Sequence, residues 1–358
     1  MEAFDLSVIW AGIIGLGVIM YVLMDGFDLG LGILFPFAPD EGTRDVMMNS
    51  VAPVWDGNET WLILGGAGLL AAFPLVYTIF LPALYLGVFL LLAGLIFRGV
   101  AFEFRFKANT SKYLWNWAFA GGSMLASFAQ GAVVGAYIQG FETENLRYVG
   151  GALDWLTPFT VLTGLGLMAG YALLASTWLI LKSEGRIQDW AYRITIPLLV
   201  TVLVVFAIVS VWTPMIDPMV RERWFSNLSV IWLLPALGLL CAFQIVRSVR
   251  NRFEGMPFVA TMGLFVFTYL GLIVSRWPYV VPPDYTLWDA SSALAVSAVP
   301  SDRSALCDSD CSWLYRLDLL GLPRQSPRGR RLSLKPAVTG PARPCSAGCA
   351  KAVGVWST

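Results

Sequence analysis

The sequence contains no histidine, and it is also poor in charged residues. Without an imidazole, the chain cannot offer the commonest protein ligand of haem iron, zinc or copper, and it has no histidine general base. Any metal centre that it serves is therefore expected mainly on another chain. Charged residues make up 13% of the 358 residues and hydrophobic ones 57%, whereas soluble domains carry about 25% charged residues. This composition predicts a polytopic membrane protein.

Eight apolar runs approach the roughly 20 residues that span a bilayer as a helix. The first lacks the flanks of a signal peptide and is predicted to be retained. The second and third meet at Phe73-Pro74 and should form an antiparallel hairpin. Paired glycines in the second and fourth runs suggest a repeated four-helix unit. We predict an all-α fold of two four-helix bundle-like units, with helices near 6–36, 57–77, 79–100, 114–139, 156–181, 194–213, 227–247 and 256–277.

Basic residues between these helices predict the orientation of the chain. The loops that follow the third, fifth and seventh helices carry ten Lys and Arg, and the loops on the opposite side carry three. Because cytoplasmic loops hold the excess of basic residues, the first set is predicted to be cytoplasmic and the N-terminus to lie outside. The ten are Arg98, Arg105, Lys107, Lys112, Lys182, Arg186, Arg193, Arg247, Arg250 and Arg252.

Two pairs of acids interrupt the apolar runs. Asp25 and Asp28 share one face of the first helix, and Asp56 and Glu59 lie one turn apart at the start of the second. A charge at the centre of a membrane helix costs about 2.5–3.5 kcal/mol on insertion scales, so these acids indicate proton or water access. Two simpler interpretations stay open: Asp25 and Asp28 could lie at headgroup depth or be neutralised by an arginine, and Asp56 could cap its helix.

The end of the third helix carries Arg98 and Glu103, which are predicted charge partners. Arg98 is the nearest cation in sequence that could neutralise an acid of the first or second helix. Trp55 and Trp61 bracket the second acidic pair, and interfacial anchoring is the default role of a tryptophan there.

Four motifs resemble subunit II of the cytochrome bd-type quinol oxidases. They are Asp-Gly-Phe-Asp-Leu-Gly at 25–30, the run from Asn49 to Leu62, the run from Phe97 to Arg105, and Trp277-Pro278-Tyr279 followed by Pro282-Pro283 and Leu287-Trp288-Asp289. Their order and spacing cover residues 1–290, which we interpret as the transmembrane domain of a subunit II.

The resemblance implies a heterodimeric oxidoreductase of the respiratory chain in a bacterial cytoplasmic (inner) membrane. Such a complex oxidises quinol and reduces dioxygen to water with protons from the cytoplasm. Subunit I carries the haem b and haem d-type centres and binds the quinol, while subunit II is cofactor-free and supports it. Small single-helix accessory subunits and membrane lipids are further expected partners, and some members hold a structural quinone on this subunit. No nucleic acid partner is expected.

Carried onto this sequence, the resemblance makes Asp56 the first candidate for a proton pathway, with Asp25, Asp28 and Glu59 as supporting acids. Trp61 resembles a residue proposed to narrow the dioxygen entry. No catalytic, cofactor-binding or metal-binding residue is expected on this chain. The alternative function is a proton-coupled membrane transporter that uses the same embedded acids as its coupling site.

Residues 291–358 depart from the family, whose members continue into a ninth helix. This tail holds nine basic and four acidic residues and four of the five cysteines, spaced as Cys307-x3-Cys311 and Cys345-x3-Cys349. Synonymous codons for residues 315–325, read one nucleotide later, can encode an aromatic helix end followed by basic residues. We therefore predict a frameshifted or disordered tail. A four-cysteine metal site is the alternative, although its spacing differs from the usual zinc pattern.

Overall fold

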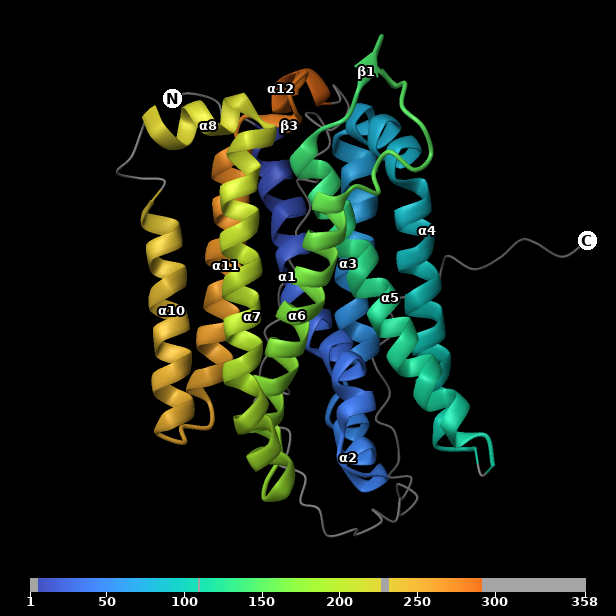
Figure 1. The fold of residues 1–358 in the computed structure, drawn as a ribbon. Coiled ribbons are helices and arrows are strands. Elements are labelled where there is room, and N and C mark those ends of the chain that lie inside the picture. The colour runs from blue at the N-terminus through green and yellow to red at the C-terminus, as the bar shows by residue number, and fades with distance from the viewer. Residues whose placement is uncertain (1–5, 109, 227–231, 292–358) are drawn as a thin grey trace, which may run out of the picture. The chain divides into compact units, whose positions relative to one another are not determined.

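The computed structural model describes residues 6–108, 110–226 and 232–291, which all belong to the first of two compact units, residues 1–327. Except for Ser291, the predicted tail lies outside the described residues. The fold is helical (Figure 1). Its helices are α1 Leu6–Leu34, η1 Phe35–Phe37, α2 Glu41–Val51, α3 Trp55–Ala72, α4 Pro74–Arg105, α5 Lys112–Gln139, α6 Pro158–Lys182, α7 Arg186–Ile216, α8 Pro218–Ser226, α10 Leu233–Arg250, α11 Met256–Arg276 and α12 Leu287–Ala290.

Two short antiparallel hairpins complete the described part. One pairs β1 (Thr143–Glu144) with β2 (Arg147–Tyr148), and the other pairs β3 (Tyr279–Val281) with β4 (Tyr285–Thr286). Both lie at the end of the bundle where α8 and α12 also lie (Figure 1). The opposite end carries α2. Asp25 and Asp28 lie near this end, because they stand in the last turns of α1, shortly before α2.

Seven of the described helices are long and apolar enough to cross a membrane: α1, α4, α5, α6, α7, α10 and α11. The remaining helix of the eight predicted, α3, forms in the expected place but is not among these seven. Asp56, Asn58 and Glu59 lie within its first two turns and lower its apolar character. The all-α polytopic fold is therefore confirmed, with one membrane-length helix that is polar at its start.

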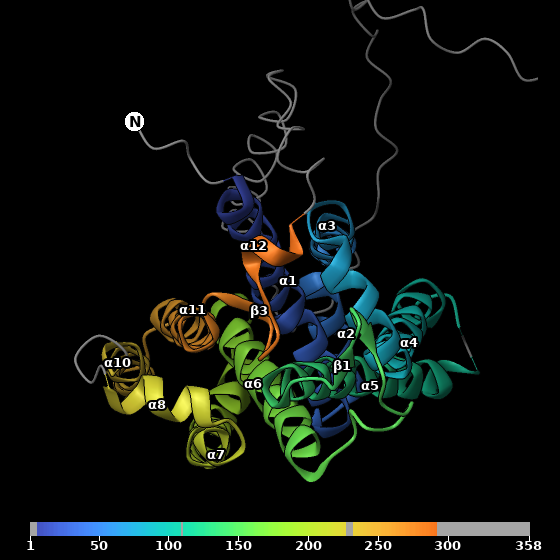
Figure 2. The same cartoon turned by 90° about the horizontal axis from the view of Figure 1, so that it is seen from above.

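The long helices form two groups of four, as the sequence predicted. One group is α1, α3, α4 and α5, the other is α6, α7, α10 and α11, and they meet where α6 packs against α1 and α5 (Figure 2). Phe73 alone separates α3 from α4. The two helices run antiparallel, because residues far from this junction on both sides meet: Trp55 of α3 stacks on Phe102 of α4 with ring centroids 4.8 Å apart.

Glycines allow the helices of this bundle to approach one another closely. A Cβ on Gly30 of α1 would collide with the carbonyl oxygen of Tyr171 in α6, and a Cβ on Gly94 of α4 would lie 2.6 Å from the carbonyl oxygen of Gly122 in α5. Backbone contact of this kind is typical of helix pairs in membranes. It holds α1, which carries Asp25 and Asp28, firmly against α6.

A single methyl group at Gly30 should loosen this packing. We expect Gly30→Ala to lower the stability of the purified protein by about 1–3 kcal/mol, the usual cost of overpacking, because the new Cβ meets backbone that cannot move aside. Gly121→Ala is the matched control, since nothing lies within 4 Å of a Cβ on Gly121. Thermal unfolding in detergent measures both, and equal melting temperatures for the two variants would contradict the packing argument.

Candidate functional site

Arg98 is the centre of a buried charge cluster. Its side chain is fully buried on α4, donates through Nη1 to Oδ1 of Asp25 on α1, and donates through Nη2 to Oε2 of Glu59 on α3 at 2.7 Å. The guanidinium also lies 5.8 Å from the centroid of the Trp55 ring. One cation therefore connects three helices, and the fork of an arginine suits two carboxylates at once.

Asp28 belongs to the same cluster, but its hydrogen-bond partner is the amide of Asn58 and not a cation. Nδ2 of Asn58 donates to Oδ2 of Asp28 at 2.8 Å and to the carbonyl oxygen of Met24 at 3.3 Å. Asp25, Asp28 and Asn58 are all fully buried. The three carboxyl groups of Asp25, Asp28 and Glu59 thus share the single positive charge of Arg98.

The cluster keeps unused hydrogen-bonding capacity. Buried side-chain polar atoms without a hydrogen-bond partner in the described part gather here: Asp28 Oδ1, Asn58 Oδ1 and Arg98 Nε. The hydroxyl of Tyr21 interacts with the carboxyl group of Asp25. Buried polar atoms are normally bonded to protein or to ordered water. These atoms therefore mark the most polar buried place in this group of helices.

The acidic side chains become more exposed from the buried cluster toward the start of α3. Asp25 has no accessible surface, the side chain of Glu59 is 30% exposed, and Asp56, one turn earlier, is exposed. Asp56 forms no ion pair with any residue in the described part. It occupies the first turn of α3, where the positive end of the helix dipole favours a negative charge.

The other predicted site residues lie apart from this cluster. Glu103 is exposed near the end of α4 and pairs at 3.5 Å with Lys107, which lies just after that helix. Trp61 is half-buried on α3. The structure therefore brings together Asp25, Asp28, Glu59 and Arg98, leaves Asp56 at the surface one turn away, and separates Glu103.

Sequence reasoning missed two members of the cluster, Asn58 and Tyr21. Each had a signal: Asn58 stands between the two acids of α3, and Tyr21 stands one helical turn before Asp25 on the same face of α1. It also treated Trp55 as an interfacial anchor, whereas this ring stacks on Phe102 and faces Arg98.

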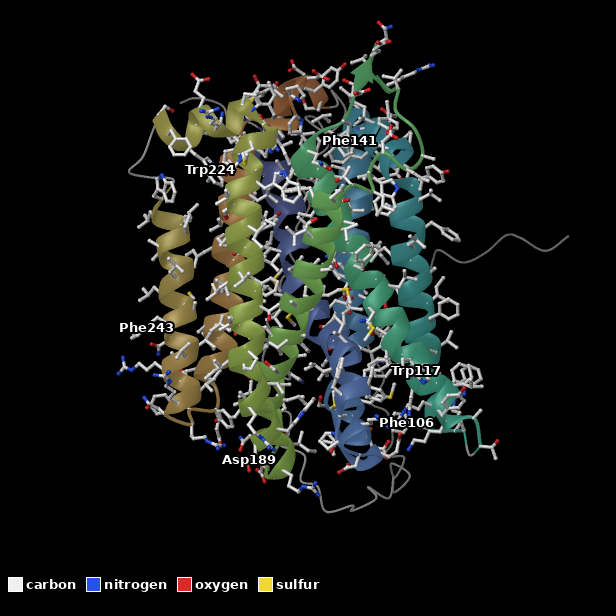
Figure 3. All side chains as sticks on the ribbon, viewed as in Figure 1. Phe106, Trp117, Phe141, Asp189, Trp224 and Phe243 are labelled. Atoms are coloured by element: carbon white, nitrogen blue, oxygen red, sulfur yellow. The ribbon has the colours of Figure 1, made fainter. Side chains whose placement is uncertain are left out.

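A second buried arginine fixes α2 at the end of the bundle. Arg105 donates to Oδ1 of Asn116 at 2.6 Å, to Oδ1 of Asp45 at 2.7 Å and to Oε2 of Glu41 at 3.1 Å. Its guanidinium lies 5.1 Å from the centroid of the Phe35 ring. This arginine ties α2 to α4 and α5. Figure 3 marks the same end of the molecule by Phe106, just after α4, and by Asp189, near the start of α7.

Histidine, an axial ligand of haem iron in many proteins, is absent from this chain. The described part contains no group of three or more His, Cys, Asp or Glu able to hold a metal ion, and its one described cysteine, Cys241, lies on α10 away from the cluster. The cluster around Arg98 consists of carboxyl groups and an amide around one cation.

Removing the cation should cost far more than its charge alone suggests. We expect Arg98→Gln to destabilise the protein by roughly 3–5 kcal/mol, because the buried Asp25 and the partly buried Glu59 lose their shared partner. Lys107→Gln is the control, since it breaks only an exposed pair worth about 0–1 kcal/mol. Thermal unfolding in detergent compares them, and a stable Arg98→Gln protein would rule out a structural role for the cation.

Comparison with known proteins identifies the family of this chain. The family model for cytochrome bd terminal oxidase subunit II matches residues 6–299. The chain is 29% identical to cytochrome bd-I ubiquinol oxidase subunit 2 of Escherichia coli (strain K12), over 80% of this chain and 86% of the relative. It is 25% identical to cytochrome bd ubiquinol oxidase subunit 2 of Bacillus subtilis (strain 168), over 79% and 86%.

A solved structure shares the fold. It is described as the structure of bd oxidase from Geobacillus thermodenitrificans, and it covers 89% of this chain and 100% of its own, with a TM-score of 0.67 and 16% identity. Its likeness is evidence for the fold alone. The match over residues 6–299 carries the assignment: the chain belongs to the cytochrome bd terminal oxidase subunit II family, and it is a multi-pass bacterial inner-membrane subunit of an oxidoreductase complex.

Proposed function

We propose that this chain supports a haem-bearing subunit I in a quinol oxidase and supplies protons to it from the cytoplasm. The observation that carries the proposal is the buried cluster of Asp25, Asp28, Glu59 and Arg98, whose acids become steadily more exposed toward Asp56. Ionisable residues inside a membrane protein are retained chiefly for such work.

Charge balance explains why the cluster can carry a proton. Arg98 supplies one positive charge, and Asp25, Asp28 and Glu59 would supply three negative ones if all were ionised. Burying two uncompensated anions is very costly, so the cluster lowers its energy by binding protons. Glu59 is the group best positioned to exchange them, because it contacts Arg98 and yet keeps 30% of its side chain exposed.

Asp56 is the proposed entrance to this route. It precedes Glu59 by one turn, its side chain is exposed, and it has no cation partner in the described part. An exposed carboxylate at the start of a membrane helix attracts protons and holds them close to Glu59. Asp56 also suits the positive end of α3, and capping and proton uptake are compatible roles for one carboxylate.

The exposed face of α3 fits a protein partner better than lipid. Asp56 and Thr60 share this face with Ile63 and Leu64, and all four are exposed. Lipid tails cannot satisfy a carboxylate or a hydroxyl. We therefore assign this face to subunit I, so that the route of Asp56 and Glu59 opens at the subunit contact.

The remaining roles follow from the family and from the residue types of this chain. Haem b and haem d-type centres, which carry the electrons from quinol to dioxygen, are assigned to subunit I because this chain has no histidine. Trp61, half-buried on α3, is the proposed constriction of a dioxygen path. A structural quinone and small single-helix accessory subunits are further proposed components. The loops rich in basic residues lie at the same end of the bundle as α2, and cytoplasmic loops hold the excess of basic residues. This end is therefore assigned to the cytoplasm and the N-terminus to the outer side.

Neutral variants of the two α3 acids test the proton route. In the assembled complex in vesicles, we expect Asp56→Asn and Glu59→Gln to slow proton uptake and oxygen reduction together, by about a hundredfold for Glu59→Gln, the lower range for a positioned proton-transfer group. Glu103→Gln is the matched control, because Glu103 is an acid near the same end of the bundle that contacts only Lys107.

The readouts separate the proton route from assembly. Haem content of the purified complex reports assembly, and the rates report proton supply. Normal rates for both α3 variants at full haem content would remove these acids from the path. The alternative, a proton-coupled transporter, predicts that the tagged chain purifies alone and colourless, whereas an oxidase subunit brings a haem protein with it.

A further inference from the structure

A cavity of about 520 Å³ opens between the start of α2 and the start of α7. It lies outside the acidic cluster and was not expected from the sequence. Arg186, Trp190 and Arg193 line it from α7, and Asp40 and Gly42 line it from the start of α2. Asp189, labelled in Figure 3, belongs to the same lining and marks its place at the end of the bundle.

The unpaired charge at this cavity is positive. Arg186 and Arg193 are exposed, lie two turns apart on one face of α7, and form no ion pair with an acid of the described part. Nε of Arg193 donates a hydrogen bond to the backbone carbonyl oxygen of Asp189, at 3.3 Å. Arginine guanidinium groups are the preferred protein partners of phosphate, which they bind through paired N–H groups.

The two acids that line the cavity are already engaged. Asp189 pairs with Arg252 at 2.6 Å. Oδ1 of Asp40 accepts from the backbone N–H of Thr43 at 2.7 Å and from its hydroxyl at 2.9 Å. These hydrogen bonds, with a smaller contribution from the nearby Arg186, hold the pKa of Asp40 below its usual value, so that it remains committed to the start of α2.

The start of α7 reinforces the positive potential. α7 is 31 residues long and begins after Gly185 with no side-chain cap, whereas the start of α2, on the other side of the cavity, is already capped by Asp40. The first N–H groups of a helix and its dipole favour an anion. They add to the two arginines, whose guanidinium groups supply the specific contacts.

The depth of the cavity matches the headgroup layer of a bilayer. The membrane-length helix α6 ends at Lys182 and the next one, α7, begins at Arg186, so the cavity opens at the boundary between these spans and water. Trp190, half-buried in its lining, is a residue type that concentrates at that boundary. A basic pocket at such a boundary is the usual form of an anionic-lipid site.

We propose that this cavity binds the phosphate of an anionic phospholipid, held by Arg186 and Arg193. The lipid would connect α7 to α2, the helix that Arg105 already ties to α4 and α5. It would thus join the two four-helix groups at one membrane face. This role is independent of proton supply by the acids of α3.

Lipid retention by the purified complex tests the proposal. After exchange into detergent with phosphatidylglycerol or phosphatidylcholine, native mass spectrometry should find phosphatidylglycerol bound, and Arg186→Gln with Arg193→Gln should bind it about thirtyfold more weakly, as expected for two basic residues near a membrane surface. Arg247→Gln with Arg250→Gln is the matched control, because both residues are exposed at the ends of the same set of loops and do not line the cavity.

Lipid retention by further variants, haem content and thermal stability decide between the possible ligands. Retention restored by the double lysine variant at 186 and 193 supports a charge-based site, and all variants should keep their haem content because the side chains are exposed. Equal loss in the cavity and control variants would reduce the effect to general surface charge and overturn the proposal. Thermal stabilisation by inorganic phosphate alone, without retention of phosphatidylglycerol, would overturn the lipid assignment and make soluble phosphate the ligand.

Discussion

The contact of Arg98 with Asp25 and Glu59 is the interaction on which the organisation of the first four-helix group depends. It joins α1, α3 and α4 through one guanidinium that has no access to solvent. A buried ion pair is weak evidence for net stability, because removing both charges from water offsets much of their attraction. The proposed proton route gives this buried ion pair a functional reason, and the unsatisfied polar atoms of Asp28, Asn58 and Arg98 lie beside it.

The polar start of α3 follows from the same constraint. A helix that carries Asp56, Asn58 and Glu59 in its first two turns is poorly suited to lipid on every side. α1 and α4 pack against α3, and the proposed contact with subunit I would cover its exposed face. The close packing at Gly30 and Gly94 keeps the helices of this group at fixed distances from their neighbours. The acids and Arg98 all lie on these helices, so their positions do not depend on a flexible loop. Packing and chemistry thus depend on the same few helices.

Sequence reasoning reached the helices and the acids for different reasons. Apolar runs of membrane length are conspicuous, and acids inside them are conspicuous too, so the spans and Asp25, Asp28 and Glu59 could be predicted. Asn58 and Tyr21 stand near these acids in the sequence but were missed, because a neutral polar residue carries no charge that needs a partner and only tertiary packing shows what it faces. α2 escaped for a similar reason: its eleven residues have no apolar run, and its buried Met47, Met48 and Val51 mark a short amphipathic helix that is stabilised by Arg105.

The central claim is that the carboxyl groups around Arg98 change protonation during turnover. Infrared difference spectroscopy of the reduced-minus-oxidised complex, with isotope-labelled aspartate and glutamate, observes this directly. The account predicts a carboxyl signal that responds to turnover, is shifted by the label, and disappears in Glu59→Gln or Asp25→Asn. A complex that turns over at the normal rate with no such signal would contradict it, and would leave these residues a purely structural role.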